Sequence, residues 1–391
     1  MGSLKQIEKF HDELTLWRRD IHAHPELGFE ENRTADLVAE KLSSFGIDVY
    51  RGLGKTGVVG TLRVGNNQTA IGLRADMDAL PITEINSFDH KSVFDGKMHA
   101  CGHDGHTTML LGAARYLAET KNFEGCVHFI FQPAEEGLGG GAAMVQDGLF
   151  EQFPMDAIFG MHNRPSAPFG QFIIRSGPMM AGGAFFDITI DGKGAHGGRP
   201  ENSIDPVLVA SHITTALQSI VSRNLKATEP LVLSVTKIHS GDAYNVIPQL
   251  AIMSGTVRAF STETLAFAET RMQEVAQNVA AAFGATVTMD FQVKFLPLVN
   301  TESETEFAAD TAAELVGEEN MDRNGPLIMG SEDFSFMLDR CPGAYINIGN
   351  GGGHSDSEVH HPSYDFNDDI LALGSSYYAR LVERKLSKSK A

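Results

Sequence analysis

The spacing of apolar residues along the sequence changes about halfway along this chain of 391 residues. Up to about residue 180, segments with helical spacing alternate with short apolar runs that are typical of buried strands. The helices are expected at 34–45, 109–120 and 142–150, and the strands at 58–64, 70–74, 127–131 and 157–161. This alternation predicts an α/β domain in which a mixed sheet is flanked by helices.

Residues 184–294 follow a different order of strand, helix, strand, strand, helix and strand, which is the order of a ferredoxin-like α+β unit. The strands are expected at 185–190, 231–238, 251–259 and 286–293, and the helices at 206–224 and 262–283. The second helix is the best supported, because apolar residues recur at steps of three and four from Leu265 to Phe283 and Gly284 follows as a cap.

After about residue 295 the α/β pattern resumes, with a helix at 306–316 and a strand at 344–348. We therefore predict a discontinuous first domain, formed by 1–180 and 295–391, around an inserted domain at 181–294. Glycine and proline at 177–183 and near 297 are candidate hinges.

The segment Met98–His106 contains three histidines, one cysteine and one aspartate. Cys101 and His103 are separated only by Gly102, and glycine allows the backbone to turn so that thiolate and imidazole point into one site. A helix N-cap at Asp104 would explain one of these residues and leave the others unexplained. The segment therefore predicts a metal centre.

Polar side chains also follow three of the predicted strands. They are Asp76 and Asp78 after 70–74, Glu135 and Glu136 after 127–131, and His162 after 157–161. In open α/β sheets, ligands bind outside the carboxyl ends of the strands. We expect these groups and the cysteine-histidine segment to converge on one crevice.

Adjacent carboxylates cannot both point the same way from an extended backbone, so Glu135 and Glu136 are expected to divide their work. One would bind metal and the other would transfer protons, an arrangement that suits hydrolysis by a metal-bound water. His360 and His361 form a further imidazole pair near the C-terminus, and spacing alone does not choose between them.

Composition excludes several classes of partner. The chain has 31 Lys and Arg against 50 Asp and Glu, and its formal charge of -19 would repel nucleic acid and anionic membranes. Its three cysteines, Cys101, Cys126 and Cys341, do not resemble a disulfide framework. The start of the chain has no apolar region of the secretory type, and no run approaches the length of a membrane span. We predict a cytoplasmic protein.

Two short motifs point to other chemistry. Gly137–Ala142 fits the dinucleotide pattern G-x-G-x-x-A and would suggest a nicotinamide oxidoreductase, but the preceding carboxylates would repel a pyrophosphate. Gly353–Ser357 is similar to the nucleophile elbow of serine hydrolases, but it lacks the final glycine. Both alternatives are weaker than a metal-dependent hydrolase.

Motifs spread over nearly the whole chain support that choice. They are Arg18–Glu26, Arg74–Pro81, Met98–His106, Pro133–Gly137, Met161–His162, Gly194–His196, Asn245–Pro248, Gly330–Phe334 and the segment at His360. Together they resemble the dinuclear metal-dependent amidohydrolases related to aminoacylase and carboxypeptidase. The most similar branch contains hippurate hydrolase, N-acetyl-diaminopimelate deacetylase and indoleacetyl-amino-acid hydrolase.

The resemblance implies two divalent metals, zinc or manganese, with cobalt and nickel also suitable. The ligands it implies are Cys101, His103, Glu136, His162 and His360, the last chosen over His361 because the family pattern is His-x-Pro. Glu135 would be the general base, and Asp76 would orient His103 from behind.

The inserted domain would be a lid that forms a homodimer or higher oligomer. It would supply His196, which reaches the substrate carbonyl across the dimer, and Asn245 and Arg258 as candidates for binding a carboxylate. The implied activity is hydrolysis of the amide bond of N-acyl amino acids, with the acyl group left open. An aminopeptidase or dipeptidase, and a noncatalytic binding protein on the same fold, are the alternatives.

Overall fold

The computed structural model describes residues 2–351 and 357–388. The chain divides into two compact units, each with its own apolar core. The first contains Met1–Met179, Val299–Pro326 and Asp333–Ala391, and the second contains Met180–Leu298 and Leu327–Glu332. Most of the elbow-like motif at 353–357 lies outside the described residues. Among the helices that are described, none has the length and apolar character needed to cross a bilayer.

The first unit is built on an eight-stranded mixed sheet with the order β1-β2-β4-β3-β5-β16-β6-β15. Its strands are β1 (Asp48–Leu53), β2 (Gly57–Val64), β3 (Ala70–Asp76), β4 (Gly125–Gln132), β5 (Ala157–Arg164), β6 (Phe172–Ile173), β15 (Met321–Asp322) and β16 (Gly343–Gly349). The central strands β4, β3, β5 and β16 run parallel, and every residue of β3, β4 and β16 is buried. Burial on both faces requires covering layers, so the predicted mixed sheet flanked by helices is confirmed.

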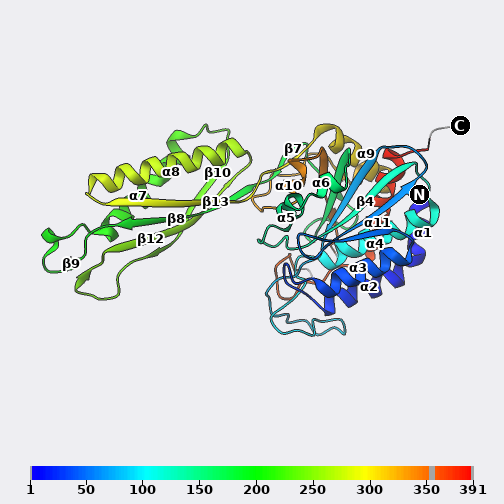
Figure 1. The fold of residues 1–391 in the computed structure, drawn as a ribbon, viewed down its shortest axis with the longest axis horizontal. Helices are drawn as coiled ribbons and strands as arrows, with labels where there is room; N and C mark the ends of the chain where they lie inside the picture. Colours follow the sequence, from blue (N-terminus) through cyan, green and yellow to red (C-terminus); the bar gives the residue numbers. More distant parts are fainter. Residues whose placement is uncertain (1, 352–356, 389–391) are drawn as a thin grey trace. The chain divides into compact units, whose positions relative to one another are not determined.

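The covering helices of the first unit come from distant parts of the chain (Figure 1). They are α1 (Gly2–Ile7), α2 (His11–Ala23), α3 (Asn32–Ser44), α4 (His103–Thr120), α5 (Gly140–Gln146), α6 (Leu149–Gln152), α9 (Glu302–Val316), α10 (Ser335–Leu338) and α11 (Leu371–Lys385). Short 3₁₀ turns at Glu8–Phe10, Glu318–Asn320 and Asp368–Ile370 join some of them.

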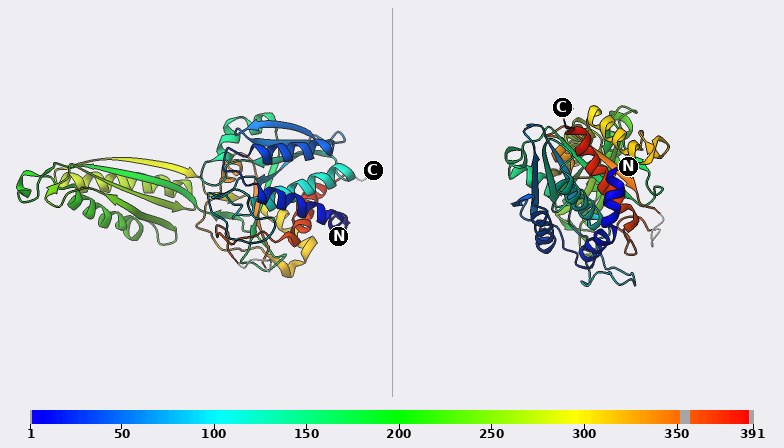
Figure 2. Two further views of the ribbon diagram at one scale, coloured as in Figure 1. Left: turned by 90° about the horizontal axis from the view of Figure 1, so that it is seen from below. Right: turned by 90° about the vertical axis from the view of Figure 1, so that its right-hand side faces the viewer.

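Helix α4 lies against α2 and α11, so that both ends of the chain enclose it (Figure 2). The approach to α11 is close, because a Cβ on Gly112 would meet the Ser375 hydroxyl at 2.5 Å and a Cβ on Gly374 would meet the Met109 sulfur at 2.0 Å. Small residues at the contact thus fix α4, and with it the segment that starts the helix.

The second unit is a four-stranded antiparallel sheet with the order β10-β12-β8-β13. Its strands are β8 (Gly182–Asp191), β10 (Leu231–His239), β12 (Leu250–Ala259) and β13 (Thr286–Phe295), and its helices are α7 (Pro206–Ser219), extended by a π-turn at Ile220–Asn224, and α8 (Thr262–Ala282). Both helices pack on one face, where alternate residues of β8 such as Phe186 and Ile188 are buried. Asp205 caps α7 and Ser261 caps α8 through their side-chain oxygens.

Two small ribbons complete the strands. One pairs β9 (Ala195–His196) with β11 (Val246–Ile247), and the other pairs β7 (Gly177–Met180) with β14 (Leu298–Asn300). A 3₁₀ turn at Pro200–Asn202 follows β9.

Several elements differ from the sequence predictions in ways that matter for the site. Helix α4 begins at His103 rather than at 109, because its first turns bury polar side chains that break the apolar spacing. Strand β5 continues to Arg164, so His162 lies within the strand rather than after it. The helix expected at 142–150 is two helices, separated at Gly148, whose φ is +90°.

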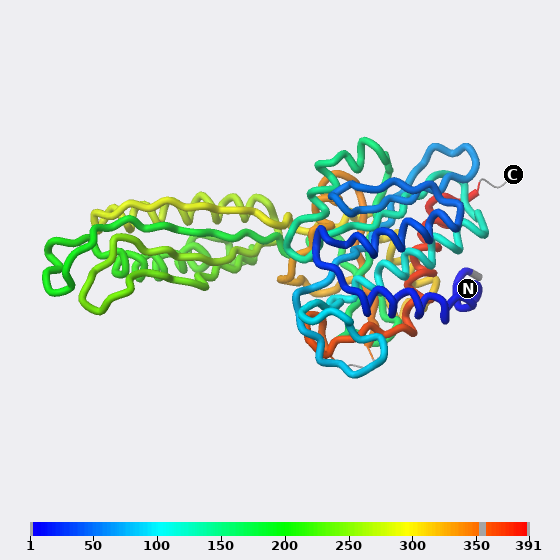
Figure 3. The backbone as a smooth tube through the Cα atoms, turned by 60° about the horizontal axis from the view of Figure 1, so that its bottom comes forward, coloured from blue at the N-terminus to red at the C-terminus, as the bar shows by residue number. Residues whose placement is uncertain are grey.

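The loop at 80–98 is hydrogen-bonded to a segment of the first unit that is distant in sequence, at 362–364. In Figure 3 this cyan loop lies beside the orange segment that follows residue 356. Its Ile85 amide donates to the Pro362 carbonyl (3.0 Å), and the Asn86 side chain donates to the Tyr364 carbonyl (3.0 Å). The loop thereby holds the C-terminal histidine segment near the start of α4.

Candidate metal centre

The site is organised around the turn that precedes α4. Gly102 has a φ of +99°, a left-handed conformation that L side chains rarely adopt. A Cβ at this position would meet the Asn163 side-chain oxygen at 2.2 Å and the Tyr364 hydroxyl at 2.8 Å. Only glycine fits here, and the turn that it makes brings Cys101 and His103 to the same space.

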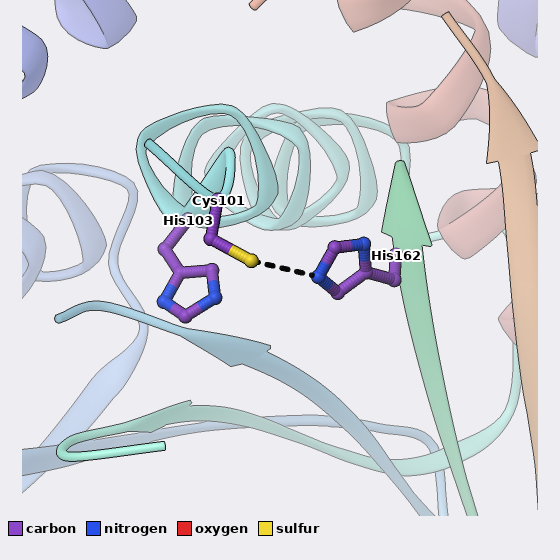
Figure 4. Close-up of side chains that lie close together, drawn as sticks. All are labelled: Cys101, His103 and His162. Carbon is purple, nitrogen blue, oxygen red and sulfur yellow. Dashed lines mark hydrogen bonds between the residues drawn. The ribbon is translucent and has the colours of Figure 1, made fainter. Parts of the chain in front are cut away.

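Figure 4 shows Cys101 and His103 projecting from the start of α4 and His162 reaching them from β5. The Cys101 Sγ lies 3.3 Å from Nε2 of His162. The other ring nitrogen of His162 lies 2.6 Å from the backbone carbonyl of Asn163, to which it can donate. Removal from water, together with the nearby His106 ring, holds the pKa of His162 well below its usual value. This low pKa favours the neutral ring, the form in which imidazole binds metal.

Two aspartates lie behind the histidines of α4. Nδ1 of His103 is 3.2 Å from Oδ1 of Asp78, and Nδ1 of His106 is 2.6 Å from Oδ1 of Asp76. The other Asp76 oxygen is 3.8 Å from Nε2 of His103. We predicted that Asp76 orients His103 from behind, but the hydrogen-bond partner of its Nδ1 is Asp78. Asp76 lies close to both rings, and its short hydrogen bond is with His106.

The two glutamates follow β4, as predicted. The Glu136 amide donates to Oδ2 of Asp78 (2.9 Å), and the Glu136 carboxylate lies 4.0 Å from Nε2 of His103. Glu135 is 7% exposed, and its carboxylate accepts a hydrogen bond from the Asp333 amide (3.4 Å). Oxygens of both glutamates lie within 4.8 Å of each other and of a His103 nitrogen. Asp78 thus supports one histidine and one glutamate of the site at once.

His360 is the C-terminal histidine that reaches this cluster. Its amide donates to the Ala100 carbonyl (2.7 Å), and its Nε2 lies 3.2 Å from Oε1 of Glu136. His361 instead accepts a hydrogen bond from the Ser363 amide through its own Nδ1 (3.1 Å). The structure therefore brings His360, and not His361, to the other predicted residues.

The predicted ligands fit a pair of divalent cations. They form two overlapping groups, Cys101 with His103 and His162, and Cys101 with Glu136 and His360, each with its donor atoms within 4.8 Å of one another. Nε2 of His103 and Oε1 of Glu136 are buried without a hydrogen bond of ordinary geometry to any described residue. Burial and the Glu136 carboxylate raise the pKa of the Cys101 thiol, so a bound cation would be needed to stabilise its thiolate.

Two predicted residues of the second unit lie together. His196 is exposed on β9, and its Nδ1 accepts a hydrogen bond from the Gly198 amide (2.9 Å). Asn245 precedes the partner strand β11, and its carbonyl accepts from the Gly197 amide (2.7 Å). Gly197, the residue after His196, therefore packs against the Asn245 backbone.

Arg258 lies elsewhere in the second unit. It pairs with Gly183 at the beginning of β8, whereas Leu250 pairs with Asp191 at the end that leads to β9. At about 3.3 Å per residue, the step from Leu250 to Arg258 spans about 26 Å. Arg258 is half-buried, with its guanidinium 5.7 Å from the centre of the Phe185 ring. The structure thus separates Arg258 from His196 by most of the length of the sheet.

A buried ion cluster beside the site was not predicted from the sequence. Arg18 is fully buried, and its guanidinium lies 2.9 Å from Asp365, 2.6 Å from Asp368 and 3.6 Å from Asp104, the residue after His103. Three carboxylates around one arginine tie α2, α4 and the C-terminal segment together. The only signal in the sequence was the spacing of Arg18 and His22 in the first family motif.

The glycine run after Glu136 has a packing role. A Cβ on Gly140 would meet the Pro133 carbonyl oxygen at 1.7 Å, and the Gly141 amide donates to the Asp333 carboxylate (2.7 Å). An amide that is already paired with a carboxylate is not available to a pyrophosphate. The dinucleotide alternative is therefore disfavoured.

Comparison with known proteins agrees with this geometry. The family model described as Peptidase family M20/M25/M40 matches residues 72–384. The chain belongs to this family. The family resemblance predicted from the motifs is thus confirmed, as is the assignment of the chain to the hydrolases.

Individual M20 relatives are similar over their whole length. A hippurate hydrolase of Campylobacter jejuni is 44% identical, covering 99% of this chain and 100% of the relative, and an N-acetylcysteine deacetylase of Bacillus subtilis is 38% identical over 95% and 97%. A solved Bacillus subtilis structure, described as a dinuclear metal-binding peptidase of the M20 family, superimposes with a TM-score of 0.85 at 34% identity, covering 97% of this chain and 99% of that one.

Proposed function

We propose that this M20 hydrolase cleaves the amide bond of N-acyl amino acids and releases a carboxylic acid and a free amino acid. The observation that carries the proposal is the juxtaposition of Glu135 with His103 and Glu136, a buried carboxylate beside donors that could hold a metal ion. The similarity to hippurate hydrolase over the full length supports an acylated amino acid as the substrate.

Two divalent cations would be held by Cys101, His103, Glu136, His162 and His360. When bound, they would polarise the substrate carbonyl and lower the pKa of water. Thiolate, imidazole and carboxylate together suit zinc, and also manganese, cobalt or nickel. The dinuclear description of the related Bacillus structure supports the number of ions.

Glu135 is the proposed general base. It would take the proton of the attacking water and later give it to the departing amine, so that one carboxylate serves both halves of the reaction. Its burial, and the hydrogen bond that it accepts from the Asp333 amide, fix its position beside the cluster. Asp78 would keep His103 and Glu136 in register with it.

The second unit is proposed to be a ferredoxin-like lid that forms a homodimer. Its strand order, β10-β12-β8-β13, and its two helices on one face support this proposal. Strand β10 is at the edge of the sheet, and exposed apolar side chains line it and the neighbouring helix. They are Val207, Leu208, Val221, Val232 and Ile238. An exposed apolar edge of this kind supports pairing with a second copy.

His196 is the proposed donor to the oxyanion, supplied to each site by the other copy of the chain. Asn245, beside it, and Arg258, at the opposite end of the sheet, are the proposed contacts for the substrate carboxylate. Because about 26 Å separates the two ends, one site would take Arg258 and His196 from different copies. All three cysteines are free and buried, which suits the predicted cytoplasmic location.

A substrate panel tests the proposal. The chain is reconstituted with zinc or manganese and given benzoyl, acetyl and indoleacetyl derivatives of several amino acids, alongside dipeptides with a free N-terminus. We expect release of free amino acid from the acylated compounds and little from the dipeptides. Faster turnover of the dipeptides would favour the aminopeptidase alternative, and no release from any compound would contradict the proposal.

A further inference from the structure

The residue before the proposed base has an unusual backbone conformation. Ala134 has a φ of +53°, in the left-handed region that a residue with a Cβ rarely adopts. Such a conformation persists only where surrounding contacts hold it, and it is concentrated at functional sites. Ala134 is followed directly by Glu135 and Glu136, so its backbone angles set the direction of both carboxylates.

Every group of Ala134 is held by the first unit. Its amide donates to Oε1 of Glu31 (2.8 Å), and its carbonyl accepts from the Gly140 amide (3.0 Å). Its methyl group faces Gly28, where an added Cβ would lie 3.1 Å away. Two of these three contacts, those to Glu31 and Gly28, come from the segment between α2 and α3.

Glu31 is itself rigidly placed. Its side chain is fully buried, and its second oxygen accepts a hydrogen bond from the Thr56 hydroxyl (2.6 Å). Its backbone carbonyl accepts the first bond of α3, from the Ala35 amide (2.9 Å). A buried carboxylate whose two oxygens both accept hydrogen bonds is held in place, and it fixes the position of the amide that donates to it.

We propose that Glu31 is a positioning residue for the hydrolysis. Its carboxylate holds Ala134 in the left-handed conformation and thereby aims Glu135 and Glu136 at the same cluster. Without that hydrogen bond, Ala134 relaxes toward ordinary angles and the base is displaced from the attacking water. Displacements of about 1 Å can cost about a hundredfold in rate. The inference depends on the proposed role of Glu135.

Three variants separate this role from a general effect on folding. Glu31→Ala removes the acceptor, whereas Glu31→Gln keeps an oxygen that can accept from the Ala134 amide. Glu26→Ala is the matched control, because the Glu26 carboxylate caps α3 by accepting from the Arg33 and Thr34 amides (2.9 and 2.8 Å). Its side chain has no hydrogen bond to Ala134.

We expect Glu31→Ala to lower kcat about 10- to 100-fold at saturating metal with little change in KM, as for other residues that orient a metal site from behind. Hydrogen exchange of the metal-free chain should accelerate in peptides covering residues 133–137. Glu31→Gln should retain most of kcat. Adding Ala134→Gly to Glu31→Ala should recover about tenfold, because glycine adopts the left-handed conformation without a steric penalty.

Wild-type kcat and exchange in Glu31→Ala would overturn the inference, as would an equal loss of kcat in Glu26→Ala. If Glu31→Ala does not fold, Thr56→Val weakens the same contact from the other oxygen and should change kcat and exchange in the same direction; no change would again overturn it. Glu135→Gln distinguishes a failure of the proposed role of Glu31 from a failure of the proposed mechanism. If that variant is inactive while Glu31→Ala is normal, only the role of Glu31 fails, whereas an active Glu135→Gln removes the proposed mechanism as well.

Discussion

The two units present their chemical groups in opposite ways. In the first unit, Cys101, His103 and Glu135 are buried, and hydrogen bonds from neighbouring elements fix them. In the second unit, His196 and Asn245 are exposed on a two-stranded ribbon and are held by backbone contacts. The metal-binding chemistry is therefore organised in advance within one unit. The exposed groups would act fully only when a substrate or a second copy removes them from water.

The largest effect is expected from the buried base. Replacing Glu135 by Gln removes the proton acceptor but keeps the shape of the side chain, and we expect kcat to fall about 10³- to 10⁴-fold. Metal content, measured by elemental analysis, should stay at the wild-type value because Glu135 is not a proposed ligand. Retained turnover would contradict the assignment of the base.

The next effect is expected from the exposed histidine. His196→Ala should lower kcat about 10²- to 10³-fold, as for other residues that stabilise an oxyanion, without changing metal content.

Mixing subunits tests whether His196 acts across a dimer. Neither Glu135→Gln nor His196→Ala alone should be active, but a mixed population should regain up to about a quarter of wild-type activity, because half of the pairs are mixed and each mixed pair contains one complete site. Mixtures with no more activity than their components would show that His196 acts within its own chain or not at all.

In the first unit, the sequence predicted which residues lie together, but not every contact between them. Cys101 and His103 were predicted from the high density of potential metal ligands around them, and Glu135 and Glu136 from their place after a predicted strand. The partner of His103 could not be predicted, because Asp76 and Asp78 are two residues apart and both are candidates. In the structure Asp78 bonds to Nδ1 of His103, and Asp76 bonds to His106.

Another prediction concerns the ligands. Cys101→Ala removes the donor that the two overlapping groups share, and we expect metal affinity to fall by more than about 100-fold. Titration of the metal-free chain with zinc, followed by calorimetry, measures this change. His361→Ala is the matched control, since this neighbour of His360 points to Ser363 and should bind metal normally. Equal loss in both variants would reverse the choice between the two histidines.

The smallest effect is expected from pH. His22 is buried between Asp104 (2.8 Å) and Glu84 (3.2 Å), with Arg18, His90 and His99 also facing it. Burial opposes its charge, but hydrogen bonds to the two carboxylates raise its pKa from 6.5 to about 9.

Because the pKa of His22 is raised on folding, its contribution to stability is complete below pH 6.5 and is lost as pH rises through about 9. At constant metal, we expect Tm to fall on the order of 5 °C across this range. His22→Gln, which does not titrate, should show a smaller fall. An equal fall in both proteins would assign the pH dependence to another group.

Helices α4 and α11 show what the spacing of apolar residues does not predict. Helix α11 was not predicted, because Gly374, Ser375 and Ser376 interrupt its apolar spacing. Yet Gly374 and Ser375 lie at its close contact with α4. The first turns of α4 were missed for a similar reason. Small and polar residues make these contacts, and a pattern of apolar residues cannot register them.

Gly102 limits which substitutions the proposed metal centre can accept during evolution. The residue at 101 meets its surroundings through a side chain, so another donor there would alter which metal the centre prefers. At 102 no side chain fits at all, because Asn163 and Tyr364 occupy the space that a Cβ would need. Substitutions could therefore change the metal preference of the site more easily than they could change its position in the fold.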